Sequence, residues 1–320
     1  MQEKLFMKIV ILGAGAIGRL LGVFLGRGGH RVVLVDPDRK IVDTLNNQGI
    51  GFMEAGAADP DSVVYTPTTA VSQASAVDSC DLVLLAVKSF DTLSAIQSAQ
   101  HLVSDTSPVV TLQTGLGNIE NLERVIAREN IIGGFTFMAA TSLGSGIVRQ
   151  GGAGKTYLGE MDGRIGERLR NVCAMFADSG LECTPVHRIK GRLWCKVIVF
   201  SAINAVTSIL QVKNGQLLDN MESITLLKRL IDEGRKVAES QAVDLVFHDL
   251  YQLLFDACRR TDQNLSSMLQ DTLEGKQTEI DAQCGVLVKL AEQAGIATPT
   301  QQTMLELVQL ISKKQHRSMA

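Results

Sequence analysis

Paired cysteine motifs, a surplus of positive charge and an uninterrupted apolar run are all missing from this sequence of 320 residues. Lysine and arginine total 31 against 34 aspartates and glutamates, a net charge of -3, so neither nucleic acid nor an anionic membrane is an expected partner. The six cysteines are scattered without a CxxC pair, and the five histidines do not cluster near them. We therefore expect reduced thiols in a cytoplasmic protein, with no metal site.

Signals for membrane targeting are also missing. The first ten residues, "MQEKLFMKIV", do not contain a basic region followed by an apolar core and a cleavage site, so a secretory signal is not expected. The longest apolar stretch, residues 197–212, is interrupted by two serines, an asparagine and a threonine, which argues against a membrane span. Length and composition instead favour a globular protein of two domains.

The sequence begins with a βαβ pattern. The segments "KIVILGAG", "RLLGVFLGRGGH" and "RVVLVD" predict a strand, a helix and a second strand. Further strands are expected at "DLVLLAVK", "PVVTLQTG" and "NIIGGFTFM", and "GIVRQGGAGKTYLGE" is expected to add late strands to the same sheet. The predicted fold class is α/β, with an N-terminal Rossmann-type parallel-sheet domain over residues 1–187.

The pattern changes after Pro185. Residues 189–314 have helical apolar spacing that is interrupted mainly at turns containing glycine, and strand signals are nearly absent. We therefore expect an all-helical C-terminal domain over residues 188–320, which would bind the substrate and contain the catalytic residues.

Gly13, Gly15 and Gly18 have the GxGxxG spacing of a dinucleotide-binding loop, directly after the first strand. The first glycine permits the turn, the second lets the backbone approach a pyrophosphate, and the third lets the helix pack closely on the strand. The alternative is a glycine-rich turn that holds no ligand. The predicted cofactor loop consists of Gly13, Ala14, Gly15, Ala16, Ile17 and Gly18.

Asp36 ends the second predicted strand. A carboxylate at this place accepts hydrogen bonds from the hydroxyls of the adenosine ribose and repels a 2′-phosphate, so NADH is favoured over NADPH. Arg39 and Lys40 leave the opposite preference open, because either cation could reach a phosphate instead of lying in solvent at the start of the next helix.

The segment "GRLWCKVIVFSAINAVTS" predicts an apolar helix that contains a lysine. Lys196 and Asn204 are about two turns apart on one side of this helix, and Phe200 lies between them. A buried lysine costs free energy unless its charge is used or its pKa is lowered, so Lys196 is a candidate residue of the substrate site. The alternative is a lysine that lies along a half-buried face and keeps its amine in water.

These segments together resemble the ketopantoate reductases (2-dehydropantoate 2-reductases) over nearly the whole chain. The motifs are "ILGAGAIG", "LLAVKSFDT", "LQTGLGNIENL" and, as the most specific, "LSSMLQDTLEGKQTEID". The resemblance implies hydride transfer from NAD(P)H to a 2-oxo acid in pantothenate biosynthesis. It implies Lys196 as general acid, Glu279 as active-site glutamate, Asn204 and Ser267 as substrate contacts, and Lys88 near the nicotinamide. A small-molecule 2-oxo acid is the expected partner, and a homodimer is left open.

Two positions depart from the family pattern. Thr114 stands in the cofactor-binding loop where the family usually has asparagine, and it keeps a hydroxyl. Phe200 replaces an asparagine among the substrate contacts and makes the pocket more apolar. One alternative is therefore a broad NADH-dependent D-2-hydroxyacid dehydrogenase of branched or aromatic 2-oxo acids. Another is a non-catalytic dinucleotide-sensing protein, which would not need Lys196.

Glu279 also has a structural alternative. The segment "TEID" resembles a helix start with Thr278 as N-cap and Asp281 at the third position, where acidic residues stabilise a helix. A helix start and an active-site role are compatible.

Overall fold

The structure is a computed structural model that describes residues 6–57, 59–144, 146–152 and 154–318. Its contacts divide the chain into two units. The first unit is Met1–Gln113 with Asn118–Ile189, and the second is Thr114–Gly117 with Lys190–Ala320. The second unit therefore includes a short segment from within the N-terminal part of the sequence.

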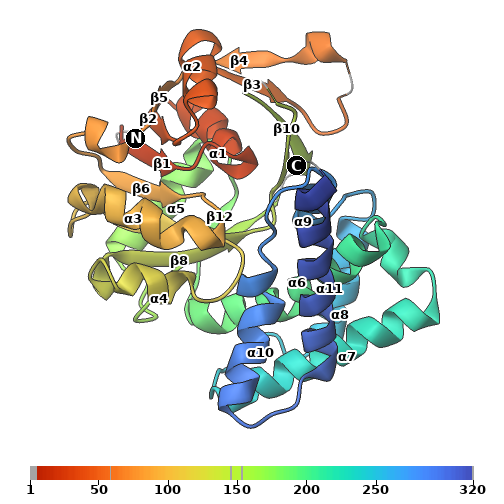
Figure 1. Ribbon diagram of the computed structural model, residues 1–320. Helices are drawn as coiled ribbons and strands as arrows, with labels where there is room; N and C mark the ends of the chain where they lie inside the picture. The colour runs from red at the N-terminus through yellow and green to blue at the C-terminus, as the bar shows by residue number, and fades with distance from the viewer. Residues whose placement is uncertain (1–5, 58, 145, 153, 319–320) are drawn as a thin grey trace. The chain divides into compact units, whose positions relative to one another are not determined.

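The first unit is built around an eight-stranded sheet with the order β12-β11-β8-β7-β6-β1-β2-β5 (Figure 1). Neighbouring strands are parallel except β8 and β11, which are antiparallel. The predicted α/β fold with a parallel N-terminal sheet is confirmed. The strands are β1 (Lys8–Leu12), β2 (Arg31–Val35), β5 (Thr69–Val71), β6 (Leu82–Leu85), β7 (Val109–Thr111), β8 (Ile131–Thr136), β11 (Thr156–Glu160) and β12 (Cys183–Pro185).

Helices cover both faces of this sheet. In β1, Ile9 and Ile11 pack with residues of α1 and α5, whereas Val10 and Leu12 pack with residues of α3 and α4. Successive side chains of a strand point to opposite faces, so burial of both faces explains the continuous apolar run. The helices are α1 (Ala16–Arg27), α2 (Arg39–Gln48), α3 (Thr92–Ala99), α4 (Asn118–Glu123) and α5 (Glu167–Asp178), with short 3-10 helices η1 (Pro60–Ser62), η2 (Ala74–Ala76), η3 (Ser89–Asp91), η4 (Gln100–Leu102) and η5 (Arg128–Asn130).

A second, four-stranded sheet has the order β4-β3-β10-β9. Its strands are β3 (Ile50–Met53), β4 (Val64–Thr66), β9 (Ala139–Ser142) and β10 (Ile147–Gly152). The expectation that residues 146–160 extend the main sheet is therefore wrong for β10 and right for β11. The reason is that β10 folds back antiparallel on β9 and pairs with β3, and Val148 alone among its residues is buried.

Arg19 joins the second sheet to α1. Its guanidinium donates to the Ser142 hydroxyl at 2.6 Å and to the Ile147 carbonyl at 3.1 Å, and the residue is only 3% exposed. Because Arg19 lies in the first turn of α1, this contact fixes the helix that follows the glycine loop.

The described residues of the second unit form helices joined by turns and loops, and no strand lies among them. The apolar face of α6 packs with residues of α7, α8, α10 and α11 in one buried cluster. Among the described helices, only α6 is long and apolar enough to span a membrane by length and composition, and 83% of its apolar window is buried within the fold. The helices are α6 (Ile189–Leu210), α7 (Met221–Ser240), α8 (Leu250–Arg260), α9 (Ser267–Leu273), α10 (Cys284–Gln293) and α11 (Pro299–Ser318), with the 3-10 helices η6 (Gly215–Leu218) and η7 (Ile280–Ala282).

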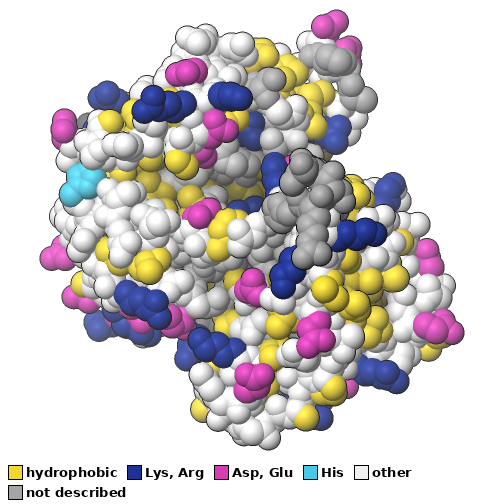
Figure 2. All heavy atoms as spheres, in the orientation of Figure 1, with side chains coloured by type: hydrophobic (Ala, Val, Ile, Leu, Met, Phe, Trp, Pro, Cys, Tyr) yellow, Lys and Arg dark blue, Asp and Glu magenta, His cyan; other side chains and the backbone are white. Residues whose placement is uncertain are grey.

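Charged side chains of both signs are interspersed over the face that Figure 2 shows, with hydrophobic side chains among them. This distribution agrees with the near balance of acidic and basic residues in the sequence, a net charge of -3.

Candidate active site

The glycine loop lies between β1 and α1. Gly13 has a φ of 100°, and a Cβ there would lie 2.9 Å from the backbone of Ala86. A Cβ on Gly18 would lie 1.9 Å from the carbonyl oxygen of Gly13, so both positions need glycine for the fold itself. Around Gly15, in contrast, nothing lies within 4 Å of where a Cβ would be. The open side of the loop at Gly15 is therefore the place where a pyrophosphate fits.

The loop is also suited to an anion by its helix. Gly15 is the N-cap of α1 and no side chain caps it, so N–H groups of the first turn remain for a phosphate. The dinucleotide implied by the sequence thus fits the residues present here.

Asp36 follows β2 directly and is half-buried. Its Oδ2 accepts from the backbone N–H of Ala14 at 2.8 Å, and its Oδ1 accepts from the N–H of Asp38 at 3.0 Å. These bonds fix the carboxylate beside the glycine loop, and a carboxylate has further acceptor sites for ribose hydroxyls. Arg39 and Lys40 lie exposed in the first turn of α2.

The segment after β6 contacts the same loop. Ala86 donates its N–H to Leu12 at 2.8 Å and lies against Gly13, and half-buried Lys88 follows two residues later. Asp91, which the sequence reasoning did not single out, ends the next short helix η3. Burial raises the pKa of Asp91, and the negative charge of Asp36 raises it further. Two carboxylates therefore act on each other beside the loop.

Lys196 is the central residue of the helical unit's candidate site. It lies on α6 and is 8% exposed, so its amine is not held in water along a half-buried face. Burial lowers the pKa of Lys196 to about 8, and the nearby Glu279 carboxylate opposes part of this shift. The amine nitrogen lies 5.5 Å from the centre of the Phe200 ring. Two other predicted residues, Glu279 and Phe200, thus lie near this amine.

Glu279 precedes η7 and is itself 8% exposed. It occupies the N-cap position of this short helix, but its side chain makes no capping bond, and α10 begins only at Cys284. The alternative of a helix start capped by Thr278 is therefore wrong, because "TEID" forms a 3-10 turn in which Thr278 lies buried before the cap.

Thr114 lies beside the same turn, in the short segment Thr114–Gly117 that belongs to the helical unit. Leu116 donates its N–H to the carbonyl oxygen of Ala282 at 2.9 Å. Gly115 has a φ of 105°, and a Cβ there would lie 2.7 Å from the Ala282 side chain. The close approach needs glycine and holds the loop of Thr114 against the turn of Glu279.

Asn204 lies on α6 one turn beyond Phe200 and is 3% exposed. Its Nδ2 donates to Oε1 of Gln283 at 2.9 Å. Gln283, which directly precedes α10, was not singled out from the sequence. Asn204 is therefore held to the segment that contains Glu279.

Ser267 is exposed at the first position of α9. The capping role belongs to its neighbour Ser266, whose hydroxyl accepts from the N–H of Leu269 at 3.1 Å. Ser266 also lies 2.7 Å from the Thr207 hydroxyl of α6. The start of α9 is thus packed on α6, the helix that contains Lys196 and Asn204, whereas the side chain of Ser267 is exposed.

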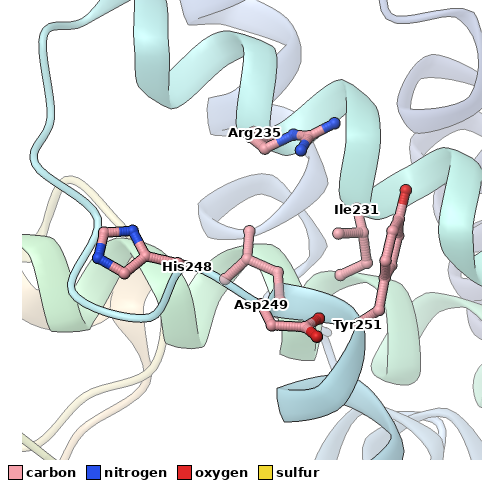
Figure 3. A pocket seen from close by; sticks show the side chains of 6 residues that line it. Ile231, Arg235, His248, Asp249 and Tyr251 are labelled. Carbon is pink, nitrogen blue, oxygen red and sulfur yellow. The ribbon is translucent and has the colours of Figure 1, made fainter.

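One hollow of about 370 Å³ in the helical unit contains none of the predicted residues (Figure 3). Two of its polar groups have structural partners. The Tyr251 hydroxyl donates to Asp232 at 2.6 Å, and Asp249 caps α8 by accepting from the N–H of Gln252 at 2.9 Å. Its lining is Ile231, Arg235, His248, Asp249, Leu250 and Tyr251.

Two family models match most of this chain. Residues 9–163 match the family model described as ketopantoate reductase PanE/ApbA, and residues 188–312 match the model of its C-terminal region. The chain belongs to the ketopantoate reductase family. The 2-dehydropantoate 2-reductase of Halobacterium salinarum is 32% identical to this chain, and the match covers 96% of this chain and 99% of that protein. That of Pyrococcus horikoshii is 35% identical over 92% of this chain and 93% of its own.

The fold of this chain is also similar to a solved ternary structure of D-mandelate dehydrogenase with NADH and anilino(oxo)acetate. It has a TM-score of 0.89 at 25% identity and covers 97% of this chain and 100% of its own. The predicted family is confirmed, and with it the prediction of an NAD(P)-dependent oxidoreductase.

Proposed function

We propose that this protein reduces ketopantoate to pantoate with NADH, and that Lys196 is the general acid. The observation that supports this best is the buried amine of Lys196, which has a pKa of about 8 and lies near the Glu279 carboxylate. A proton donor with a pKa close to the working pH is suited to general acid catalysis.

The glycine loop would hold the pyrophosphate through backbone N–H groups at Gly15 and the start of α1. When bound, the reduced nicotinamide supplies the hydride. Lys88 and Thr114 are the proposed contacts near the nicotinamide, and Asp36 is the proposed acceptor for the ribose hydroxyls. Asp36 and Asp91 together would repel a 2′-phosphate, which supports NADH as the preferred cofactor.

Reduction leaves negative charge on the substrate's carbonyl oxygen, and the Lys196 ammonium stabilises this charge and donates the proton. Glu279 keeps the ammonium protonated, because an opposite charge favours the charged form of the amine. The Phe200 ring lies 5.5 Å from the amine and excludes water from that side of it. The neutral amine of Lys196 that remains then regains a proton from solvent after each turnover.

Asn204 and Ser267 are the proposed contacts that orient the substrate, by hydrogen bonds to its carboxylate or its chain. Asn204 is already fixed by its bond to Gln283, at 2.9 Å, so it would lose little freedom on binding.

A second candidate is a broad D-2-hydroxyacid dehydrogenase of branched or aromatic 2-oxo acids. Phe200 favours it, because an aromatic ring beside the reacting amine suits an apolar substrate. The similarity in fold to D-mandelate dehydrogenase supports it as well.

The test is a steady-state screen of kcat/KM for ketopantoate, 3,3-dimethyl-2-oxobutanoate and phenylglyoxylate, each with NADH and with NADPH. We expect ketopantoate with NADH to give the highest value. A higher value with phenylglyoxylate would support the second candidate instead. Tight binding of NADH without turnover of any 2-oxo acid would overturn both candidates and support a dinucleotide sensor.

We further propose that residues 1–187 bind the cofactor and residues 188–320 bind the substrate. A cytoplasmic location is supported by the six cysteines, all of which are free thiols. A homodimer is the proposed assembly, since the helical unit exposes large apolar side chains such as Met221 at 68% and Leu310 at 61%. Light scattering of the purified protein tests this assembly.

A further inference from the structure

Two buried amides meet between α6 and the start of α10. Asn204 is 3% exposed and Gln283 is 1% exposed. The Nδ2 of Asn204 donates to the Oε1 of Gln283 at 2.9 Å. Gln283 follows η7 directly, so this one bond joins the helix of Lys196 to the turn of Glu279.

The bond determines which atom of Asn204 remains for a ligand. An asparagine side chain has an NH2 donor and a carbonyl acceptor. One of the two N–H donors of this amide is used by Gln283, whereas the carbonyl oxygen of Asn204 makes no hydrogen bond within the described part of the chain and is not fully enclosed. Asn204 therefore offers an acceptor.

Gln283 has no other visible purpose in the core. Its Nε2 is enclosed without a hydrogen-bond partner among the described residues, which costs free energy. Its neighbours Ile280 and Cys284 are buried, so an apolar side chain would suit the surroundings better. A buried amide that is kept at such a cost, and that holds a proposed substrate contact, points to a role in positioning.

We propose that Gln283 is a positioning residue that turns the carbonyl oxygen of Asn204 toward the substrate, so that the site selects 2-oxo acids with a hydroxyl donor. This inference rests on the proposed function, in which Asn204 contacts the substrate. Ketopantoate has such a hydroxyl on its fourth carbon. The matched compound 3,3-dimethyl-2-oxobutanoate lacks only this hydroxyl, so the ratio of the two kcat/KM values isolates its contribution.

The first test compares Gln283→Met and Gln283→Glu. Methionine has a similar length and accepts no comparable hydrogen bond, so it frees the Asn204 amide. We expect Q283M to lower the ketopantoate to 3,3-dimethyl-2-oxobutanoate ratio by about tenfold, the scale of one net hydrogen bond. Glutamate keeps a carboxyl oxygen that accepts from the Nδ2 of Asn204. The ratio in Q283E should therefore stay within about threefold of the native value. Melting temperature and NADH fluorescence titration check folding, and Gln283→Leu replaces Q283M if that variant does not fold.

A second test separates this inference from the proposed function. Asn204→Ala should lower the same ratio, and Q283M added to it should lower the ratio no further, because the two residues act as one unit. If N204A leaves both substrates unchanged, the proposed role of Asn204 is wrong. If N204A lowers the ratio but Q283M does not, only the positioning role is overturned. A rise of the ratio in Q283M would mean that the native amide presents its NH2 to the substrate, which also overturns the inference.

Discussion

The amine of Lys196 lies 5.5 Å from the centre of the Phe200 ring, one turn further along α6. A cation over an aromatic face is stabilised, whereas burial of an amine favours its neutral form. Burial dominates here, because the pKa of Lys196 is lowered to about 8 although Glu279 also favours the charged form. The residue can therefore lose and regain a proton near neutral pH.

Replacement of this amine tests the proton donor. Lys196→Ala should lower kcat for the 2-oxo acid by roughly a hundredfold or more, the usual scale for a positioned acid. NADH affinity, followed by fluorescence, should change little, because Lys196 lies on α6 and the glycine loop lies between β1 and α1. A loss of turnover of only a few-fold would mean that another group donates the proton.

The pH dependence follows from the same pKa. Reduction needs the ammonium, so kcat/KM for the 2-oxo acid should fall as pH rises through about 8, and oxidation of the 2-hydroxy acid should rise over the same range. Glu279→Gln removes the charge that favours the ammonium and should move this midpoint to lower pH. A midpoint that stays in place in the variant would contradict the pairing of Glu279 with Lys196.

Folding stability should depend on the same group. Because the pKa of Lys196 is lower in the folded chain than its ordinary value of 10.5, the unfolded state binds more protons between pH 8 and 10.5. The contribution of Lys196 to the free energy of unfolding therefore increases as pH rises from about 8 to 10.5.

A substitution at Gly15 tests whether the glycine loop binds a dinucleotide or is a turn that holds no ligand. Nothing lies within 4 Å of a Cβ built on Gly15, and its φ of -68° suits alanine, so Gly15→Ala should fold with nearly native melting temperature. If the open side of the loop receives the pyrophosphate, the methyl group should weaken NADH binding by at least about tenfold, a free-energy change near 1.4 kcal/mol. Unchanged affinity in a titration of G15A would favour the turn without a ligand. Gly18→Ala is the matched structural control, because its Cβ would meet the Gly13 carbonyl at 1.9 Å and destabilise the fold.

Asp36 and Asp91 should set the cofactor preference together. Asp36→Asn removes a charge that repels the 2′-phosphate. This substitution should therefore lower the ratio of kcat/KM with NADH to kcat/KM with NADPH. Asp91→Asn should lower the same ratio by a smaller factor. The Asp36 carboxylate accepts a hydrogen bond from Ala14 of the glycine loop at 2.8 Å, whereas Asp91 makes no such bond to this loop. A native enzyme that works substantially better with NADPH would instead assign the selection to Arg39 or Lys40.

The main sheet could be predicted because its signals are local. Leu82–Leu85 is buried on both faces and reads as a continuous apolar strand, and the glycines of the first turn lie close together in the sequence, within residues 13–18. The placement of β10 could not be predicted, because its partners Gly51–Met53 and Ala139–Ser142 are chosen by long-range pairing. The strand has too few buried residues to reveal its sheet.

The candidate site shows the same division. Lys196 was predictable because a lysine stands out in an apolar helix. Gln283 was not, because its role depends on a bond to a residue 79 positions away. Asp91 likewise gains its effect from Asp36, which lies far from it in the sequence, directly after β2. Residues whose role depends on a distant partner need the structure.

Phe200 provides the last prediction, because it is the departure that most separates this chain from the family pattern. Its ring lies beside the Lys196 amine and offers the substrate no hydrogen bond. Phe200→Asn should shift the kcat/KM ratio of ketopantoate to 3,3-dimethyl-2-oxobutanoate toward ketopantoate by about 1 to 3 kcal/mol, because the new amide can pair with the hydroxyl that only ketopantoate has. The ratio is insensitive to a general loss of folded enzyme, since both substrates are measured on the same preparation. Phe200→Leu, which removes the ring without adding an amide, is the matched control and should leave the ratio nearly unchanged. A ratio that does not respond to F200N would mean that Phe200 packs only within the helical core and does not line the substrate site.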